Sequence, residues 1–438
     1  MSERGFFSGR KAFILATAAS AVGLGNIWRF PTMAAQHGGG AFLLAYIIVV
    51  LLFGVILLMT EIALGRRKHK SPVDAFEDLD KRGKPIGLLA TLVPAIIAPY
   101  YCVICAWILG YLFGYCGGMD MAAPGTFGDF IISPLSAFCL VIIFAVVAYI
   151  IYRGVTHGIE KISVVFMPLF IVMLVVLTIY ILFQPNVQDG IGFYLSIHWD
   201  QLNLGVFTSA LGQAFFSLSL AMGIIITYGS YMNKKEDIEK CSLTIVAIDT
   251  FVAMLSGLLI VPVVYATYGG NIPSGPTLIF ESLPSIFSGM PAATLVAILF
   301  FIMVFIAAIT SAISIVEAVV STLMDRLHVT RKKGLLMYLI PMVVMGVIVY
   351  LGFGPLDFIN IGGKGILDLF DFVTNNIMMP IVAFCTCVFI GHLVGTKVVE
   401  DEISSSSSKF RLKPIYPFMI KWVAPILILI IFVGGLVS

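Results

Sequence analysis

Long apolar segments with few charged residues recur from one end of this chain to the other, separated by short polar connections. A helix needs about 20 mainly apolar residues to cross the hydrocarbon layer of a bilayer. A helix is also the form in which a lipid-surrounded segment satisfies its own backbone hydrogen bonds. The pattern therefore predicts eleven membrane-spanning helices, at residues 10–36, 41–64, 86–116, 131–152, 162–183, 206–231, 241–268, 291–324, 334–351, 366–394 and 415–437.

The composition supports the same fold class. Of the 438 residues, 60% are hydrophobic and 11% are charged, whereas a soluble domain carries roughly 25% charged residues. We expect an all-α integral membrane protein that forms a single polytopic domain over residues 1–438. Five spans fall at about 10–183 and five at about 206–394, and an extra helix follows at about 415–437. The lipid bilayer is the expected surrounding, and no nucleic acid is an expected partner.

The basic residues are distributed unevenly between the two sides of these spans. All of the 26 lysines and arginines except Arg29 and Lys364 lie at the N-terminus or in every second connection after it. Because cytoplasmic connections are the ones enriched in Lys and Arg, the N-terminus is expected in the cytoplasm. Eleven spans would then place the C-terminus outside the cell, in a protein of the cytoplasmic membrane.

Two spans contain small and polar residues where a regular helix is weakest. The first is the segment 20–26, SAVGLGN, and the second is the segment 217–223, SLSLAMG. They occupy matching places in the two halves of five spans, which is typical of inverted-repeat transporters with broken helices around a central binding site. The alternative is that the glycines only allow close helix packing.

Five motifs carry a resemblance to a known family. They are AVGLGNIWRFP (21–31), GGGAF (38–42), GIEKISVVFMP (158–168), QAFFSLSLAMG (213–223) and AAITSAISIVE (307–317). In this order the chain resembles the neurotransmitter:sodium symporter family, and most of all its bacterial amino-acid transporters, from about residue 4 to residue 394. The resemblance implies a leucine-transporter-like fold with two inverted five-helix repeats, with helices 1 and 6 unwound at mid-membrane. It also implies alternating access and sodium-coupled symport of an amino acid into the cell.

The resemblance implies two Na⁺ sites made of oxygen ligands, which a hard cation prefers. The second would combine hydroxyls with carbonyls, and helical spacing independently places the Thr310 hydroxyl beside the Ala307 carbonyl. The alternative is that such hydroxyls only bond to their own helix. Site one would comprise Ala21, Asn26, Ser217 and Asp249 with the substrate carboxylate, and site two Ala19, Val22, Ala307, Thr310 and Ser311.

Asp249 departs from the family pattern, because relatives commonly carry Asn there. Chloride-dependent relatives hold an anion beside the first sodium ion. A fixed carboxylate near the cation offsets its charge in the same way. We therefore expect transport without chloride.

Gly23 stands where the monoamine transporters of the family carry an Asp that receives the substrate amine. A site without that carboxylate suits a ligand that brings its own, such as an α-amino acid. Met222, an adaptable thioether, favours hydrophobic or aromatic side chains. By resemblance, the substrate-binding residues are Ala21, Val22, Gly23, Leu24, Gly25, Ile97, Tyr101, Phe216, Ser217, Ser219, Met222, Ser311 and Ile315.

The resemblance also implies a gate on each side of the site. Arg29 and Asp371 would form the outer gate, with Tyr101 and Phe216 as its lid. The inner gate would comprise Arg4, Asp325 and Tyr231, with Phe7 as an aromatic plug, and Glu61 would brace the break in the sixth span. Gly158 and Pro168 bracket a segment of the fifth span that could unwind, although a proline kink is the simpler interpretation.

Other classes of function fit less well. No span carries H-E-x-x-H or a comparable catalytic set, so the chain is not expected to be an enzyme. The seven cysteines lie almost all in apolar runs and are assigned no disulfide and no metal. A substrate-sensing receptor or a channel-like protein of the same fold is the alternative function, and the sequence leaves the oligomeric state open.

Overall fold

The computed structural model describes residues 5–269, 272–273, 275–406 and 410–437. Within these residues every regular element is helical, and only two isolated β-bridges occur. Here η marks 3₁₀- or π-helical segments. In the first half of the chain the helices are α1 (Arg10–Ala21), η1 (Gly25–Arg29), α2 (Phe30–Gln36), α3 (Gly40–Val49), η2 (Val50–Gly54), α4 (Val55–Lys68), α5 (Pro72–Glu77), η3 (Lys81–Gly83), α6 (Lys84–Cys116), α7 (Thr126–Ile131), α8 (Pro134–Gly154), η4 (Val155–Glu160), α9 (Lys161–Leu182) and α10 (Gln188–Leu195).

The second half repeats the pattern of long apolar helices joined by short segments. Its elements are η5 (Trp199–Gln201), α11 (Leu204–Ser217), α12 (Ile224–Ser230), α13 (Ile238–Tyr268), η6 (Leu278–Ser282), α14 (Leu283–Ser288), α15 (Ala293–Leu327), α16 (Arg331–Leu351), α17 (Ile366–Phe372), η7 (Val373–Met378), α18 (Met379–Val388), η8 (Phe389–Val394), α19 (Lys397–Ser404), α20 (Tyr416–Phe418), η9 (Met419–Val423) and α21 (Ala424–Val437).

Within the described ranges, eight helical stretches are long and apolar enough to cross a membrane. A ninth is obtained when α1 and the η1–α2 helix, which are bent by 56° relative to each other, are counted as one span. Nine of the eleven predicted runs fall on continuous helical stretches, as 86–116 does on α6 and 334–351 on α16, whereas 10–36 and 206–231 are each interrupted. The chain is thus a multi-pass membrane protein.

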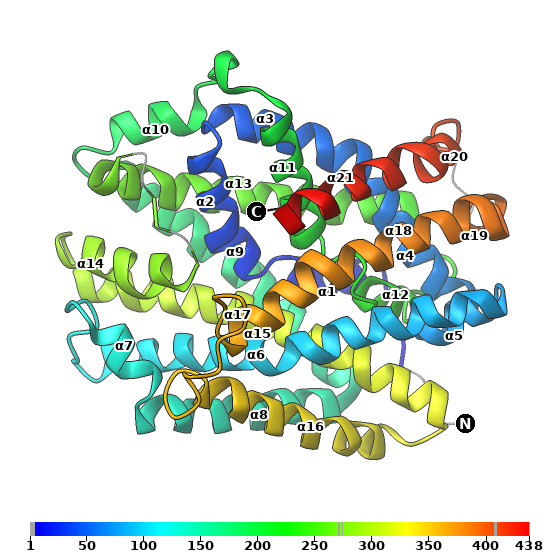
Figure 1. Ribbon diagram of the computed structural model, residues 1–438, viewed down its shortest axis with the longest axis horizontal. Helices are drawn as coiled ribbons and strands as arrows, with labels where there is room; N and C mark the ends of the chain where they lie inside the picture. Colours follow the sequence, from blue (N-terminus) through cyan, green and yellow to red (C-terminus); the bar gives the residue numbers. More distant parts are fainter. Residues whose placement is uncertain (1–4, 270–271, 274, 407–409, 438) are drawn as a thin grey trace.

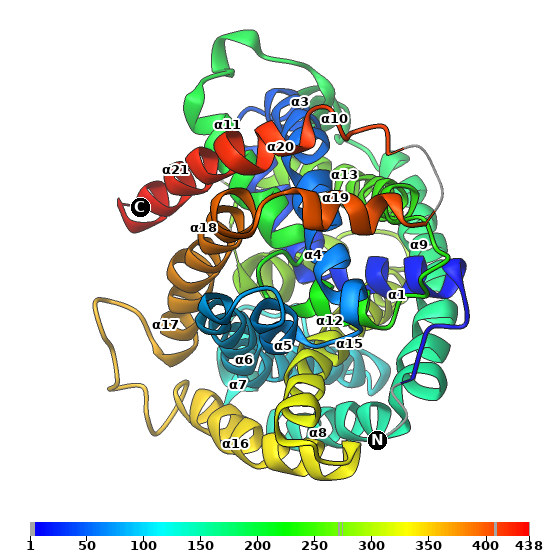
Figure 2. The same cartoon turned by 90° about the vertical axis from the view of Figure 1, so that its right-hand side faces the viewer.

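The two longest helices form the centre of the molecule. α6 and α15 pack side by side. In their most apolar segments 83% and 78% of the residues are buried, whereas only 33% are buried in α16 and 28% in the last span, Tyr416–Gly434. Figure 1 shows most long helices running in broadly similar directions, with the short elements α5, α19 and α20 at one end and α7, α10 and α14 at the other. Figure 2 shows the same bundle turned by 90°, with α16 and α21 on its outside.

Helical structure is interrupted in the two spans whose sequences suggested it. α1 ends at Ala21, and Val22 and Gly23 are not helical before the chain turns into η1. α11 ends at Ser217, and residues 218–223 form turns before α12 begins. In this second break Ser219, Ala221 and Gly223 have φ of 53°, 61° and 67°. Left-handed conformations are uncommon for residues with a Cβ, so neighbouring contacts must hold Ser219 and Ala221 in place.

One of these contacts comes from α4. The Ala221 amide donates to the Glu61 carboxylate at 2.7 Å, and Glu61 is buried. The backbones of α4 and α12 are also in direct contact. A Cβ on Gly65 would lie 1.8 Å from the Ile226 carbonyl oxygen, and a Cβ on Gly229 would lie 2.6 Å from the Ile62 carbonyl oxygen. α4 and α12 therefore form one tightly joined pair.

The fifth span contains no unwound segment here. Gly154, at φ 80°, separates α8 from the π-helix η4, and α9 continues through Pro168 without a break. Gly158 lies inside η4, and a Cβ there would meet the Ile150 oxygen at 2.3 Å. The glycine thus serves close packing of η4 on α8 in this structure, and unwinding of this segment stays a prediction.

Candidate functional site

The Asn26 side chain stabilises the break in the first span. The Gly23 amide donates to Asn26 Oδ1 at 3.0 Å, and this bond links the non-helical residues of the break to η1. On the other face of η1, Gln213 Nε2 of α11 donates to the Gly25 carbonyl at 3.0 Å. These contacts bring the two broken spans together.

Asn26, Ser217 and Asp249 form one buried cluster. Asn26 Nδ2 lies 2.8 Å from Asp249 Oδ1 and 3.0 Å from Ser217 Oγ. The Ser217 hydroxyl lies 2.8 Å from Asp249 Oδ2, and the Tyr46 hydroxyl lies 3.5 Å from the same oxygen. Asn26 and Asp249 are fully buried. Because a buried charge must be paired or hydrogen-bonded, this arrangement can hold the Asp249 carboxylate away from water, and it also concentrates oxygen ligands beside the first break.

A second group of oxygens lies where α15 passes the same break. Ser311 Oγ is 3.2 Å from the Ser20 carbonyl oxygen and 3.3 Å from that of Val22. One residue earlier, Thr310 Oγ1 bonds to its own helix, at 3.1 Å from the Ala307 oxygen. Ala19, predicted for the same set, lies in the last turn of α1, next to Ser20. Hydroxyl and carbonyl oxygens of α15 and of the first break therefore meet at Ser311.

A cavity lies between the two broken spans, α6 and α15. Of the thirteen predicted substrate residues, twelve line it and Val22 does not. The twelve are Ala21, Gly23, Leu24, Gly25, Ile97, Tyr101, Phe216, Ser217, Ser219, Met222, Ser311 and Ile315.

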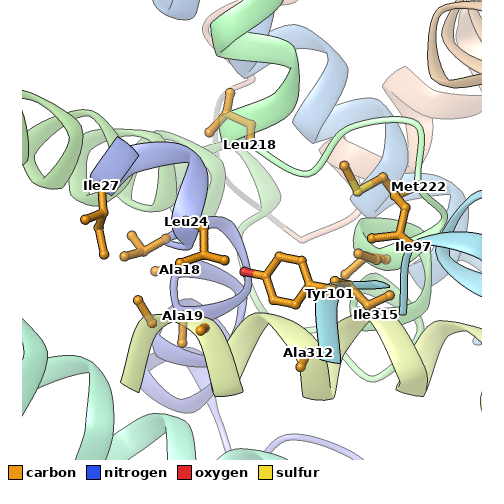
Figure 3. Close-up of a cluster of buried hydrophobic side chains, with 14 of the residues drawn as sticks. Ala18, Ala19, Leu24, Ile27, Ile97, Tyr101, Leu218, Met222, Ala312 and Ile315 are labelled. Carbon is orange, nitrogen blue, oxygen red and sulfur yellow. The ribbon is translucent and has the colours of Figure 1, made fainter. Parts of the chain in front are cut away.

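The cavity is polar at one end and apolar at the other. Figure 3 shows the Tyr101 hydroxyl pointing towards Leu24, with Ile97, Met222 and Ile315 grouped beyond the other end of the ring. A Cβ on Gly23 would lie 2.7 Å from Ser311 Oγ and 3.2 Å from the Tyr101 hydroxyl. Any side chain at Gly23 would therefore crowd the polar end.

Five further lining residues were not predicted from the sequence, namely Ser20, Trp28, Tyr100, Ile104 and Ile224. Helical spacing could have found Ile104, because it lies seven residues after Ile97 and three after Tyr101 on α6. Ile224 begins α12 directly after the second break, and no local pattern indicates that it faces the cavity.

The predicted outer pair does not form an ion pair between Arg29 and Asp371 in this structure. The Arg29 guanidinium lies over the Phe216 ring, 5.0 Å from its centroid. Asp371 instead accepts hydrogen bonds from the Tyr100 hydroxyl at 3.1 Å and from Asn375 Nδ2 at 2.6 Å. Asp371 therefore has other donors, and Arg29 is held by a cation–π contact.

On the opposite side of the cavity, Tyr231 belongs to a buried hydrogen-bonded group. The Tyr231 hydroxyl donates to Glu317 Oε1 at 2.6 Å, and Arg331 makes two contacts with the same carboxylate at 2.7 and 2.9 Å. Glu317 is fully buried. This group joins the end of α12 to α15 and α16, and neither Glu317 nor Arg331 was predicted from the sequence as a functional residue.

Two further residues predicted for the inner gate, Asp325 and Phe7, also make contacts in this structure. Asp325 Oδ2 accepts the Ser71 amide at 2.8 Å, while Arg4, its expected partner, lies outside the described residues. Phe7 is 4% exposed, with edge-on ring contacts to Phe13 and Tyr228. Phe7 is therefore buried among aromatic rings, and its role as a plug stays a prediction.

Three comparisons with known proteins show what this chain is similar to. The profile described as "Sodium:neurotransmitter symporter family" matches residues 4–117 and 131–438. An "Uncharacterized sodium-dependent transporter" of Haemophilus influenzae is 32% identical over 99% of this chain and 98% of its own length. The Bacillus subtilis protein "Uncharacterized sodium-dependent transporter YhdH" is 32% identical over 96% and 95%. The crystal structure of MhsT in complex with L-phenylalanine superposes with a TM-score of 0.88 at 35% identity, covering 99% of this chain and all of MhsT.

Proposed function

Because the chain belongs to the sodium:neurotransmitter symporter family, we propose that it carries a hydrophobic or aromatic L-amino acid into the cell together with Na⁺. The protein is a membrane transporter and not an enzyme. The observation that carries the proposal is the cavity between the two broken spans, which has oxygen clusters at one end and apolar side chains at the other.

We propose that the chain crosses the cytoplasmic membrane eleven times. The stretch Pro134–Leu182 counts as one span by length, but its 49 residues would extend for ~74 Å, far beyond a hydrocarbon core of about 30 Å. It would therefore contain two crossings, α8 and α9, which are joined through Gly154 and η4. α11 and α12 together supply one more crossing, interrupted at mid-membrane like the first. The basic residues favour a cytoplasmic N-terminus and an extracellular C-terminus, and residues 10–183 and 206–394 would be the two inverted repeats of a single domain.

The first Na⁺ would bind at the cluster of Asn26, Ser217 and Asp249, together with the Ala21 carbonyl and the substrate carboxylate. These are oxygen donors, which suit a hard cation. The Asp249 carboxylate supplies a fixed negative charge at this site. The Asn that relatives commonly carry at the same position is neutral. Transport is therefore expected to proceed without chloride.

The second Na⁺ would bind where Ser311 faces the Val22 carbonyl, with Thr310 and the carbonyls of Ala19 and Ala307. All of these groups are neutral. Binding of Na⁺ here would link α15 to the first break, in place of the direct bonds from the Ser311 hydroxyl to backbone carbonyls.

The substrate would place its carboxylate at the polar end of the cavity, near Tyr101 and the amides of Leu24 and Gly25. Its side chain would extend between Ile97, Met222 and Ile315. MhsT, whose structure this chain resembles along its whole length, was crystallised with L-phenylalanine, and the apolar lining found here suits a ligand of that kind.

Alternating access would use the groups on either side of the cavity. Arg29, Asp371 and the Phe216 ring would close the outer path. Tyr231 and Asp325, with Arg4, would close the inner one. The Arg29 side chain would have to leave the Phe216 ring or carry it along to reach Asp371, so the outer gate is expected to tighten when substrate is bound.

Uptake into proteoliposomes tests the proposal. Purified protein is reconstituted, and labelled phenylalanine and leucine are supplied with Na⁺ outside, with Na⁺ on both sides, or without Na⁺. Accumulation only under an inward Na⁺ gradient is expected, and unlabelled hydrophobic and aromatic amino acids should compete. Saturable binding without accumulation would favour the receptor alternative, and competition restricted to small or charged amino acids would contradict the assigned substrate class.

A further inference from the structure

A second pocket lies where α6 ends, and we call it the outer pocket. It is formed by the end of α6, the turn that follows, α14 and the start of α15, and its lining includes Tyr115, Asp120 and Thr294. Figure 1 shows α14 at the end of the bundle opposite to α5 and α19, which is the extracellular end in the proposed topology. Among the described residues, none lines both the outer pocket and the central cavity. The outer pocket is therefore a separate place for a ligand.

The start of α15 has no side-chain cap. This helix of 35 residues begins after Ala292, whose φ of 54° lies in the left-handed region. Ala292 provides no capping hydrogen bond, and the first turn of α15 carries no acidic residue. The N–H groups at a helix N-terminus are not used inside the helix, and together they carry a partial positive charge that binds anionic groups. Ala293 and Thr294, the first two residues of α15, line the outer pocket, so this side of the pocket suits a carboxylate.

The Tyr115 hydroxyl is a second donor that calls for an acceptor. Trp107, Tyr111 and Tyr115 follow one face of α6, and their side-chain polar atoms have no hydrogen-bond partner among the described residues. Trp107 and Tyr111 both meet the Phe280 ring edge-on, and an aromatic ring is a weak acceptor. Tyr115 instead lies against Phe301 at a tilt of 32°, and it is the one of the three that lines the outer pocket. Because Tyr115 is only 9% exposed and a buried donor without an acceptor is costly, an acceptor in the pocket would stabilise it.

A carboxylate lies on another side of the outer pocket. Asp120 is exposed in the turn after α6, and its Oδ1 accepts the Ala122 amide at 3.1 Å. The charge of Asp120 acts on the Tyr115 hydroxyl, so a simple anion at this hydroxyl would be repelled. A ligand that carries a cationic group beside its anionic group would satisfy both sides. Met119 and the buried Phe287 add apolar surface to the same lining.

We propose that the outer pocket binds an α-amino acid in its zwitterionic form, at a site separate from the transport cavity. The carboxylate accepts hydrogen bonds from the Tyr115 hydroxyl and from the first amides of α15, while the ammonium group pairs with Asp120. A hydrophobic side chain lies against Met119 and Phe287. Binding at this second site does not require Na⁺, because no residue of the two proposed Na⁺ sites lines the outer pocket. An occupied pocket would tie α14 to the outer ends of α6 and α15.

Binding of labelled phenylalanine to the purified full-length protein in lipid nanodiscs, with choline in place of Na⁺, tests the assignment. We expect saturable binding under these conditions. Tyr115→Phe removes a hydrogen bond to a charged group and should weaken this binding about tenfold. Tyr152→Phe is the matched control, because it makes the same change at an exposed position of α8, and it should leave the binding unchanged.

A second variant and two analogues test the cationic side of the site. Asp120→Asn should weaken the binding a few-fold, since Asp120 is exposed and exposed ion pairs are weak, and Asp129→Asn in α7 is its exposed control. Hydrocinnamate lacks the ammonium group of phenylalanine, and phenethylamine lacks its carboxylate. Each should compete with labelled phenylalanine only at several-fold higher concentration than unlabelled phenylalanine does. Equal competition by either analogue would overturn the zwitterion assignment.

A contrast between two variants distinguishes the outer pocket from the central cavity. Binding in choline should survive Tyr101→Phe and weaken in Tyr115→Phe, and the reverse pattern would place this binding in the central cavity and overturn the proposal. In proteoliposomes Tyr115→Phe should keep Na⁺-driven uptake, which also shows that the variant is folded. Asp120→Asn, an exposed change, keeps the test decisive if Tyr115→Phe loses both activities.

The same samples separate the outer pocket from the proposed function. Absence of Na⁺-driven uptake by the wild type would count against the proposed function. Wild-type uptake without saturable binding of phenylalanine in choline would count against the outer pocket alone.

Discussion

Replacing Asp249 by Asn changes one atom in the buried cluster and removes its only negative charge. The amide would keep an oxygen for the cation, but an NH₂ group would face the Ser217 and Tyr46 hydroxyls, which now lie 2.8 and 3.5 Å from Oδ2. Asp249→Asn is close to isosteric, so the fold should persist. The effect should therefore appear mainly in Na⁺ binding.

The magnitude follows from electrostatics. Two unit charges about 4 Å apart interact by ~4 kcal/mol at an effective dielectric constant of about 20. Part of this is regained because the neutral side chain is easier to bury. A net loss of about 2–4 kcal/mol remains, which corresponds to a roughly 30- to 1,000-fold weaker Na⁺ affinity.

The assay is Na⁺-dependent uptake of labelled phenylalanine with chloride or with gluconate as the anion. The wild type should transport equally well in both, whereas Asp249→Asn should need far more Na⁺ and should be stimulated by chloride. Asp129→Asn is a suitable control, because it makes the same change at an exposed position of α7. A collapse of wild-type uptake in gluconate, or a wild-type Na⁺ requirement in Asp249→Asn, would refute the reasoning.

Three further variants test other parts of the site. Ser311→Ala removes a proposed ligand of the second Na⁺ and should reduce the Hill coefficient for Na⁺ from about two towards one, as measured by the Na⁺ dependence of uptake; an unchanged coefficient would argue against a Na⁺ ion there. Tyr101→Phe removes the hydroxyl at the polar end of the cavity and should raise KM for the amino acid about tenfold, the value of a hydrogen bond to a charged group, with a smaller effect on maximal rate. Glu317→Gln leaves Arg331 without its charged partner and should lower the free energy of unfolding by about 3–5 kcal/mol, seen as a lower Tm in detergent; an unchanged Tm would mean that the pair contributes little.

The positions of the helices could be predicted well, because hydrophobic length is a local property of the chain. The predicted run 366–394 coincides with the helical stretch from α17 to η8, and 162–183 lies within one residue of α9. The breaks could be anticipated for the same reason, since Gly23 and Gly223 lie within short segments of small and polar residues. The cavity residues came from family resemblance, which carries three-dimensional information that spacing alone does not.

Long-range polar pairs could not be predicted. Glu317 and Arg331 belong to different helices, and nothing in either local sequence indicates that they meet or that Tyr231 joins them. The outer gate shows the converse problem. The resemblance assigned Arg29 and Asp371 to one gate, but Phe216 and Tyr100 provide competing partners whose positions depend on tertiary packing. Side-chain choice among several available partners is decided by the whole structure.

The contact of α4 with α12 through Gly65 and Gly229 has a practical consequence for measuring motion in this protein. Two backbones that touch without intervening side chains cannot slide past each other by changing rotamers, so we expect the pair to stay rigid throughout the cycle. Spectroscopic probes on these two helices should report one constant separation under all ionic conditions. Such a pair would serve as an internal ruler, against which the displacement of a probe on α1 or α9 could be calibrated.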